Sequence, residues 1–294
     1  MKNVTAIGEI LYDIYPGKKC LGGAPFNFIY HVWKLCGKTN FISSVGRDEN
    51  GDEIIDYLNR IGFDTKYISV DDQHPTGTVL VKLRDDKTPQ FTISSECSYD
   101  FITLDETARR VIETGTDLIY FGTLSQRSPV TGKTIRSFFT LNKSFFCDLN
   151  LRHDFFSAEM IEEALRVSDV VKVNSDELGK IESLFGLSTN TGDAAASLIN
   201  NFRISLLAVT DGENGAWLFS PNDSDSYKPS ATKIVDTLGA GDAYAAVLCL
   251  GFLMDLPLKV INKAANDFAA DICSVPGALP KDDMIYEKYS PLFR

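Results

Sequence analysis

The sequence has little histidine, a shortage of positive charge and no long apolar run. It contains 3 His and 6 Cys with no Cys-x-x-Cys spacing, and so it offers no pattern for a zinc site. Its 29 Lys and Arg residues against 40 Asp and Glu residues give a net charge of −11, which argues against a nucleic-acid partner. No apolar run approaches the ~18 residues of a membrane helix, and Glu9 interrupts any signal-like region. We therefore expect a cytoplasmic protein with reduced cysteines and no membrane partner.

The rest of the composition is typical of a folded globular chain. Hydrophobic residues make up 44% and charged residues 23% of the 294 positions. This length allows one large domain or two ordinary ones, and no repeat, low-complexity tract or linker divides it. We therefore predict a single domain over residues 1–294. The negative charge does not exclude an anionic small molecule, because a few backbone amides can hold a phosphate.

Short β-branched runs alternate with longer amphipathic stretches along the chain. The runs predict strands at Val4–Ile10, Asn40–Val45, Leu118–Phe121, Phe145–Leu149, Val170–Val173 and Leu206–Thr210. The amphipathic stretches predict helices at Phe26–Cys36, Asp52–Ile61, Leu104–Glu113, Gly132–Leu141, Ala158–Val167 and Asp193–Phe202. Such alternation predicts an α/β fold of three layers, α/β/α, with a mostly parallel central sheet. The loops that follow the strands are then the expected ligand-binding edge.

One part of the chain breaks the alternation. Gly77–Leu83 and Gln90–Ser95 read as two strands around the polar turn Arg84–Lys87, which predicts an antiparallel hairpin. Tyr12–Leu21 is irregular and too short for a helix. We interpret segments 12–21 and 77–98 together as a small β lid over the ligand-binding edge. An ordinary edge hairpin explains the pattern equally well.

The most informative motif spans Asp236–Asp242, where a Gly-Ala-Gly turn leads into an apolar helix that runs to about Leu253. Glycines let the backbone approach a ligand, and the free N–H groups at a helix start attract anions. In the first turn the Asp242 carboxylate can accept a proton from a hydroxyl held beside a phosphate. These are the elements of phosphoryl transfer to an alcohol. A helix-capping aspartate after a glycine-rich loop explains the motif equally well.

A second glycine-rich helix start, Gly22–Asn27, has the features of a sugar site when it is taken with Asp13. The Gly22 and Gly23 backbone permits close approach, while Asn27 and Asp13 offer partners for hydroxyl groups. Alone, such a segment also serves as an ordinary helix start.

Two other phosphate-binding patterns fail. Thr131–Thr134 ends like a Walker A loop, but Arg127 stands where that loop needs its first glycine. Gly239–Gly241 begins like a dinucleotide fingerprint, but Tyr244 stands where the third glycine belongs. We therefore expect neither a P-loop nor a dinucleotide-binding motif at these places.

These motifs, in this order, resemble the ribokinase-like (PfkB-type) carbohydrate kinases, and most of all their fructokinase branch. The resemblance runs nearly from end to end. Its motifs are Gly8-Glu9, Gly22–Asn27, Val45–Gly51, Asp148–Arg152, Asn174–Glu177, Thr210–Gly215, Asp236–Asp242 and Pro276–Ala278. Ile29 and Val247 depart from the small residues usual in the family, which affects helix packing more than chemistry.

The resemblance implies a role for each matched residue. Asp242 would be the catalytic base, in an anion hole formed by Gly239, Ala240 and Gly241. The sugar would lie against Asp13, Gly22, Gly23, Asn27 and Arg152. The nucleotide and its phosphates would lie against Asn174, Glu177, Thr210, Gly212, Gly215, Gly277 and Ala278. Glu177 would act on Mg²⁺ indirectly, and Asp236 would belong to a monovalent-cation loop. The segment Asn174–Glu177 also reads as a simple helix cap.

The expected activity is that of an ATP-dependent and Mg²⁺-dependent kinase of a neutral sugar, above all D-fructose, with K⁺ as an activator. The alternative is a 2-keto-3-deoxygluconate kinase, provided that Arg127 or Arg152 reaches the carboxylate of that substrate, or another PfkB-type sugar kinase. A non-enzymatic regulator that binds sugar with the same fold is a third reading, which the presence of Asp242 and its glycines disfavours.

The lid also suggests an assembly. Val79, Val81 and Phe91 are expected on an exposed lid face that a lone flap buries poorly. Because exposed apolar patches mark interfaces, we predict a homodimer formed through the lids.

Overall fold

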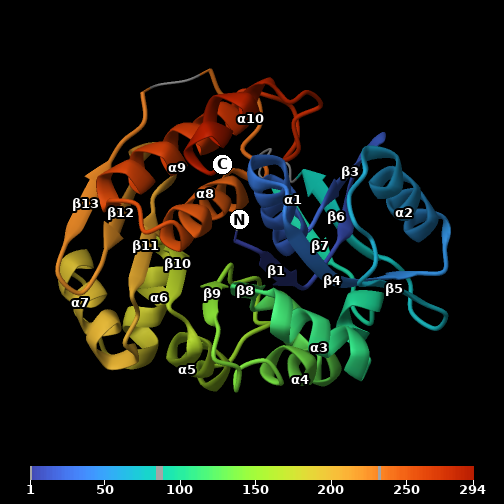
Figure 1. Ribbon diagram of the computed structural model, residues 1–294, viewed down its shortest axis with the longest axis horizontal. Helices are drawn as coiled ribbons and strands as arrows, with labels where there is room; N and C mark the ends of the chain where they lie inside the picture. Colours follow the sequence, from blue (N-terminus) through green and yellow to red (C-terminus); the bar gives the residue numbers. More distant parts are fainter. Residues whose placement is uncertain (1, 84–88, 231–232) are drawn as a thin grey trace.

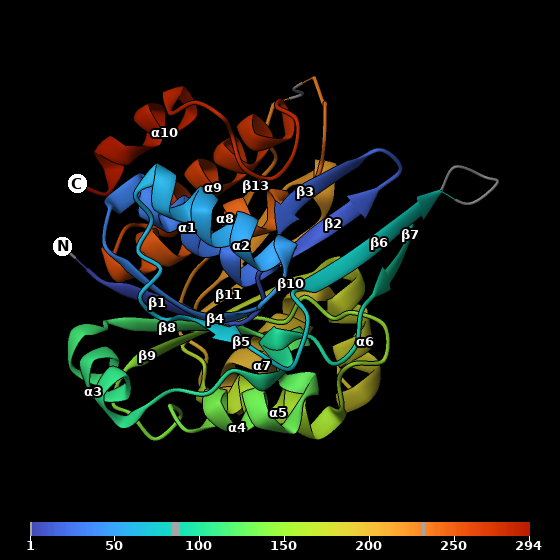
Figure 2. The ribbon, with the colours of Figure 1, turned by 90° about the vertical axis from the view of Figure 1, so that its right-hand side faces the viewer.

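The computed structural model describes residues 2–83, 89–230 and 233–294. A large sheet lies between two layers of helices, and a smaller sheet projects from this body (Figure 1, Figure 2). The three-layer α/β/α arrangement around a mostly parallel sheet is therefore confirmed. Within the described ranges, no helix is both long enough and apolar enough to cross a membrane.

The large sheet has the strand order β13-β12-β11-β10-β9-β8-β1-β4-β5. Neighbouring strands run parallel from β5 to β11, while β12 and β13 pair antiparallel. The carboxyl ends of the parallel strands therefore meet at one edge. The strands are β1 (Val4–Ile7), β4 (Thr39–Gly46), β5 (Ile68–Asp71), β8 (Leu118–Gly122), β9 (Ser144–Asp148), β10 (Val170–Asn174), β11 (Leu206–Thr210), β12 (Ala216–Phe219) and β13 (Ser224–Tyr227).

Each face of the large sheet buries its own apolar cluster beneath one helical layer. One layer contains α1 (Ala24–Cys36), α2 (Glu49–Ile61), α8 (Ala240–Leu253), α9 (Leu258–Cys273) and α10 (Met284–Tyr289). The opposite layer, seen below the sheet in Figure 1, contains α3 (Glu106–Gly115), α4 (Pro129–Arg136), α5 (Ala158–Val167), α6 (Ser175–Phe185) and α7 (Thr191–Phe202). Helix α8 is apolar nearly all round because it is packed between α1, α9 and the sheet.

The small sheet has the strand order β3-β2-β6-β7. Its strands are β2 (Leu11–Tyr15), β3 (Lys18–Gly22), β6 (Gly77–Leu83) and β7 (Pro89–Ile93). The predicted hairpin is confirmed, because β6 and β7 pair antiparallel, while its turn at Arg84–Lys87 lies outside the described residues. The irregular segment after the first strand forms a second hairpin, β2–β3, which joins β6 through β2.

The prediction that Val79, Val81 and Phe91 lie on an exposed face of this sheet is wrong for the two valines. Val79 and Val81 are buried, with 7% and 4% of their surface exposed, because they face the core cluster of the body. Phe91 is 41% exposed, as predicted, and Leu80, on the opposite face of β6, is exposed to the same extent. The exposed apolar surface is therefore smaller and divided between two faces.

Candidate active site

The residues matched to the motifs gather at the carboxyl edge of the large sheet. The loops after β9, β10 and β11 carry Asp148–Arg152, Asn174–Glu177 and Thr210–Gly215. The strand register places Asn174 directly beside Thr210, so the last two loops are neighbours. The first turn of α8 reaches the same edge, since a bond joins Asp242 to Asn27 on α1. One site thus collects segments that lie far apart in the sequence.

The start of α8 leaves two backbone N–H groups free. Gly239 precedes the helix at φ 75°, and a Cβ atom there would lie 2.4 Å from Ala278 Cβ, so only glycine fits. The Ala240 N–H donates to Thr237 O at 3.3 Å. The N–H groups of Gly241 and Asp242 have no acceptor within the described chain. An anion at this end would therefore meet two free donors and the positive end of the helix dipole.

The Asp242 carboxylate is held in place and is easily protonated. Asn27 Nδ2 donates to Asp242 Oδ2 at 2.8 Å. Burial, together with the nearby charge of Asp148, raises the pKa of Asp242 to about 7, while the Asn27 bond and the charges of Lys172 and Arg152 oppose the rise. A carboxylate with a pKa near neutrality can accept a proton from an alcohol and later release it. The geometry is that of a general base beside an anion site.

The opening of α1 shapes the other side of the site. A Cβ atom on Gly23, at φ 107°, would lie 2.5 Å from Glu9 O, so the chain needs glycine there. Asn27 Oδ1 is buried without a partner among the described residues, although its Nδ2 is bonded. Asp13 is 8% exposed, and burial raises its pKa to about 6 while the charge of Arg152 opposes the rise. Two polar groups are thus left for a ligand.

The segment Asn174–Glu177 is a helix cap, as the simpler interpretation predicted. Asn174 Oδ1 accepts from the Glu177 N–H at 2.8 Å, and Glu177 Oε2 accepts from the Asn174 N–H at 2.9 Å. Glu177 Oε1 also accepts from the Leu151 N–H at 2.7 Å. Burial raises the pKa of Glu177, and the charge of Lys172 opposes that rise. Both Glu177 oxygens therefore join the loops after β9 and β10.

Two further loops complete this edge. The turn after β11 closes through a bond from the Asp211 N–H to Gly215 O at 2.8 Å, with Gly212 exposed at its tip. Asp236 accepts from the Leu238 N–H at 3.1 Å and from the Gly277 N–H at 3.0 Å. Asp236 thus fastens the loop before α8 to the segment that contains Gly277 and Ala278.

The two arginines that could bind the carboxylate of an acidic substrate, Arg127 and Arg152, lie in different environments. Arg127 is buried and bonds both oxygens of Asp100 at 2.8 Å, as well as Ser94 O and the Tyr99 hydroxyl. The Arg152 side chain is exposed and makes no hydrogen bond or ion pair among the described residues. The Nη1 of Arg127 is also without a partner among the described residues, but it is buried, so Arg152 is the more accessible of the two to a ligand.

Lys172 at this edge was not identified in the sequence. It lies in β10 and bonds Asp148, and its charge acts on Glu177 and Asp242. A lysine inside the apolar run Val170–Val173 is the signal that could have identified it. The bond between Asn27 and Asp242 was likewise not predicted, because 215 residues separate the pair.

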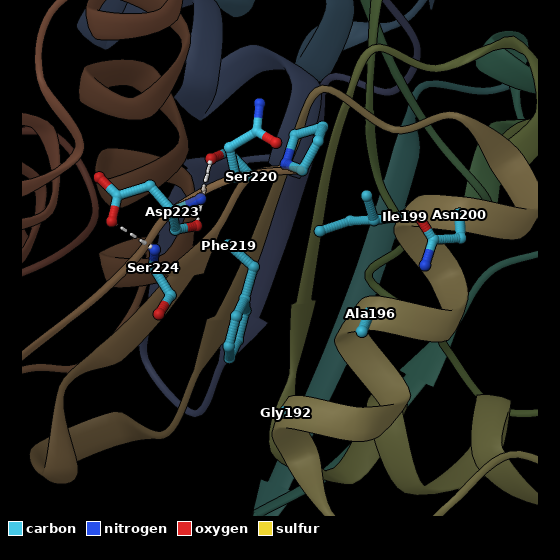
Figure 3. A pocket seen from close by; sticks show the side chains of 10 residues that line it. Gly192, Ala196, Ile199, Asn200, Phe219, Ser220, Asp223 and Ser224 are labelled. Atoms are coloured by element: carbon cyan, nitrogen blue, oxygen red, sulfur yellow. Dashed lines mark hydrogen bonds between the residues drawn. The ribbon is translucent and has the colours of Figure 1, made fainter.

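A groove between α7 and the β12–β13 turn lies away from this site (Figure 3). Its volume is about 370 Å³, and its lining includes Gly192, Ala196, Phe219 and Ser220. Because β12 runs antiparallel to β11, this turn lies at the opposite edge of the sheet. The close-up shows uncharged side chains there, among them Ile199 and Phe219, apart from Asp223.

Comparison with known proteins agrees with this arrangement. The chain matches the model of the pfkB family of carbohydrate kinases over residues 2–283. It is 28% identical to the fructokinase of Salmonella typhimurium, with 94% of this chain and 89% of that protein covered. It is also 28% identical to the fructokinase of Escherichia coli, with 84% and 83% covered. The crystal structure of an uncharacterised sugar kinase from Pyrococcus horikoshii in complex with ATP aligns at a TM-score of 0.82 and 27% identity, over 98% of this chain and 99% of that one. This chain therefore belongs to the pfkB family of carbohydrate kinases.

Proposed function

We propose that this sugar kinase transfers the γ-phosphate of ATP to a primary hydroxyl of D-fructose. The observation that carries the proposal is the position of Asp242 in the first turn of α8, bonded to Asn27 and adjacent to the free N–H of Gly241. A base and an anion site thus lie within one helical turn. The fructokinase relatives support fructose as the acceptor.

Asp242 takes the hydroxyl proton while the sugar oxygen forms its bond to the γ-phosphorus. The bond between that phosphorus and the β–γ bridging oxygen breaks, and ADP leaves with the electron pair. The N–H groups of Gly241 and Asp242 and the positive end of α8 face the negative charge that develops on the transferring group. Gly239 and Ala240 shape the same turn. Because the pKa of Asp242 is raised to about 7, the proton can pass to solvent after transfer.

The nucleotide is proposed to lie along the loops after β10 and β11 and against the segment near the C-terminus. When bound, Mg²⁺ neutralises phosphate charge. In the ranges that the structure describes, no group of three or more acidic, histidine or cysteine side chains could hold a metal. Glu177, bonded to backbone through both oxygens, fits an indirect role through water. The proposed nucleotide-side residues are Asn174, Glu177, Thr210, Gly212, Gly215, Gly277 and Ala278.

The sugar is proposed to lie against the opening of α1. Asp13 and the free Asn27 Oδ1 accept from sugar hydroxyls, the Gly22 and Gly23 backbone allows close approach, and Arg152 donates. The segments 12–21 and 77–98 act as the lid of a single domain over residues 1–294. This lid closes over the sugar and excludes water, which limits ATP hydrolysis.

A second candidate substrate, 2-keto-3-deoxygluconate, is favoured by one observation, the unpartnered Arg152 side chain. We place fructose first because the carboxyl groups of Asp13 and Asp242 lie near Arg152, whose charge opposes the rise in the pKa of both. The bonds of Arg127 to Asp100 leave it poorly placed to add a second cation. A substrate carboxylate would thus enter a site rich in negative charge.

Three further features complete the proposal. Asp236 belongs to a loop that binds K⁺ as an activator. The small sheets of two copies form a homodimer. The enzyme acts in the cytoplasm on small-molecule sugar and ATP, with neither nucleic acid nor membrane as a partner.

A panel of sugars in a coupled ADP-release assay tests this function. We expect kcat/KM for fructose to exceed that for 2-keto-3-deoxygluconate by about thirtyfold, equivalent to roughly 2 kcal/mol. A matched Arg152→Gln variant should lose more activity on the sugar acid than on fructose. A wild-type preference for the sugar acid would contradict fructose as the substrate.

A further inference from the structure

A buried ion pair lies beneath the start of α8. Lys172 of β10 and Asp148 of β9 are cross-strand neighbours. Lys172 Nζ is 2.9 Å from each Asp148 carboxylate oxygen, and their side chains are 8% and 1% exposed. The Tyr120 hydroxyl donates to Asp148 Oδ2 at 3.3 Å. Because burying two charges is expensive, a pair that only filled space could be replaced by apolar side chains at no loss.

The lysine reaches the anion site from below. A Cβ atom on Gly241 would lie 3.4 Å from Lys172 Nζ and 3.8 Å from its Cε. An ammonium group carries three N–H donors. Two of them meet Asp148, and the third has no acceptor in the part of the chain that the structure describes. One donor of a fixed cation therefore remains next to Gly241.

Both charges of this pair lie close enough to Asp242 to change its pKa. Asp148 on β9 and Lys172 on β10 act on Asp242 with opposite signs, Asn27 on α1 bonds it, and Arg152 adds a positive charge from the loop after β9. Removing Lys172 alone leaves the buried Asp148 carboxylate without its ion-pair partner and takes away one of the charges that oppose the rise in the pKa of Asp242. Removing both charges of the pair takes away one influence of each sign on Asp242 and also takes the cation from the anion site.

We propose that Lys172, fixed by Asp148, is part of the anion hole and donates its remaining N–H to the phosphoryl group during transfer. This inference rests on the proposed function, since it takes Gly241 and Asp242 as the site of transfer. The two backbone N–H groups are partial charges, whereas Lys172 supplies a full charge in a dry setting, where a donor aimed at developing charge is most effective. Asp148 prevents the ammonium from turning away or losing its proton.

The test compares Lys172→Met with the double variant Lys172→Met/Asp148→Asn. The single variant leaves an unpaired buried carboxylate, so we expect a lower Tm and a kcat reduced by about 10²–10³-fold. The double variant leaves no unpaired charge at this position, so its Tm should recover while kcat stays reduced by about 10²-fold. The KM values for ATP and sugar should change by less than about threefold, because the donor acts in the transition state.

The surface pair Lys288–Asp271, 2.7 Å apart, provides a matched control, and Lys288→Met should leave kcat unchanged. A double variant with both wild-type Tm and wild-type kcat would show that the pair is only structural and would overturn the proposal. All variants are assayed with whichever sugar the wild-type enzyme phosphorylates, so failure of fructose leaves this test intact. A wild-type enzyme that phosphorylates no sugar would overturn this proposal together with the proposed function.

Discussion

The two sides of the candidate active site are held in different ways. On the large-sheet side, Asp242 is bonded by Asn27 and Asp148 is bonded by Lys172. On the small-sheet side, Asp13 is buried, but its carboxylate makes no hydrogen bond among the described residues. The side chains proposed to act in phosphoryl transfer are therefore already held by hydrogen bonds, whereas the Asp13 carboxylate, proposed to bind the sugar, is left available to a ligand. This difference separates variants that lower kcat from variants that weaken sugar binding.

The largest effect is expected on the large-sheet side. Asp242→Asn removes the proton acceptor but keeps the size of the side chain, so kcat should fall by ~10²–10⁴ or more. The fold and ATP binding should persist, as judged by Tm and calorimetry. Near-normal turnover by a folded variant would contradict the assignment of Asp242 as the general base.

On the small-sheet side, Asp13→Asn should act on the sugar instead. The loss of charged hydrogen bonds to hydroxyl groups should lower kcat/KM for the sugar by about 10- to 100-fold. The KM for ATP should stay unchanged, and the exposed Lys82→Gln on β6 should behave as the wild type. Steady-state kinetics with each substrate varied in turn measures both. A change in kcat alone, with the KM for the sugar unchanged, would contradict the assignment of Asp13 to sugar binding.

A severalfold effect is expected at the loop that precedes α8. If the Asp236 loop holds a monovalent cation beside the anion hole, turnover should be faster in K⁺ than in a matched bulky organic cation. Asp236→Asn should remove most of this difference. Equal wild-type rates in the two buffers would mean that Asp236 only joins the Leu238 and Gly277 segments.

The smallest effect on activity is expected from assembly. Leu80 and Phe91, each 41% exposed on the small sheet, should be covered in a homodimer. Light scattering should give twice the monomer mass at assay concentration. Leu80→Lys should shift the population towards monomer with a modest loss of activity. A wild-type monomer would exclude this assembly.

The layered fold could be predicted because periodicity is a local property. The predicted strand Leu206–Thr210 and helix Ala158–Val167 coincide with β11 and α5. The predicted strand from Val4 ended too late, because the chain leaves β1 at Gly8, where φ is 150°.

Other elements gave weak or misleading local signals. The predicted helix Gly132–Leu141 was shifted, since α4 begins at Pro129, is capped by Ser128 and ends at Arg136. The polar strand β13 (Ser224–Tyr227) was not predicted, because its sequence Ser-Asp-Ser-Tyr has no apolar alternation.

In the candidate site, the motifs predicted which loops meet, while the contacts between them depend on topology. Asp242 and Asn27 were identified separately, but nothing local joins α1 to α8. A lysine in an apolar strand has no evident role in the sequence alone. Its partner becomes apparent only when β9 pairs with β10 and Asp148 lies beside Lys172. Tertiary placement therefore supplied the bonded pairs that distinguish the two sides of the site.

The pH dependence of kcat/KM tests the central claim most directly, that Asp242 is the general base, because kcat/KM reports the ionisation of the free enzyme. Burial raises the pKa of Asp242 to about 7, so below that pH the carboxyl is protonated and cannot accept a proton. We expect kcat/KM to fall about tenfold per pH unit below pH 7. In Asn27→Leu, which lacks the bond that lowers this pKa, the fall should begin at higher pH. A kcat/KM that stays constant from pH 5 to pH 8, or a profile that the variant leaves in place, would contradict the assignment.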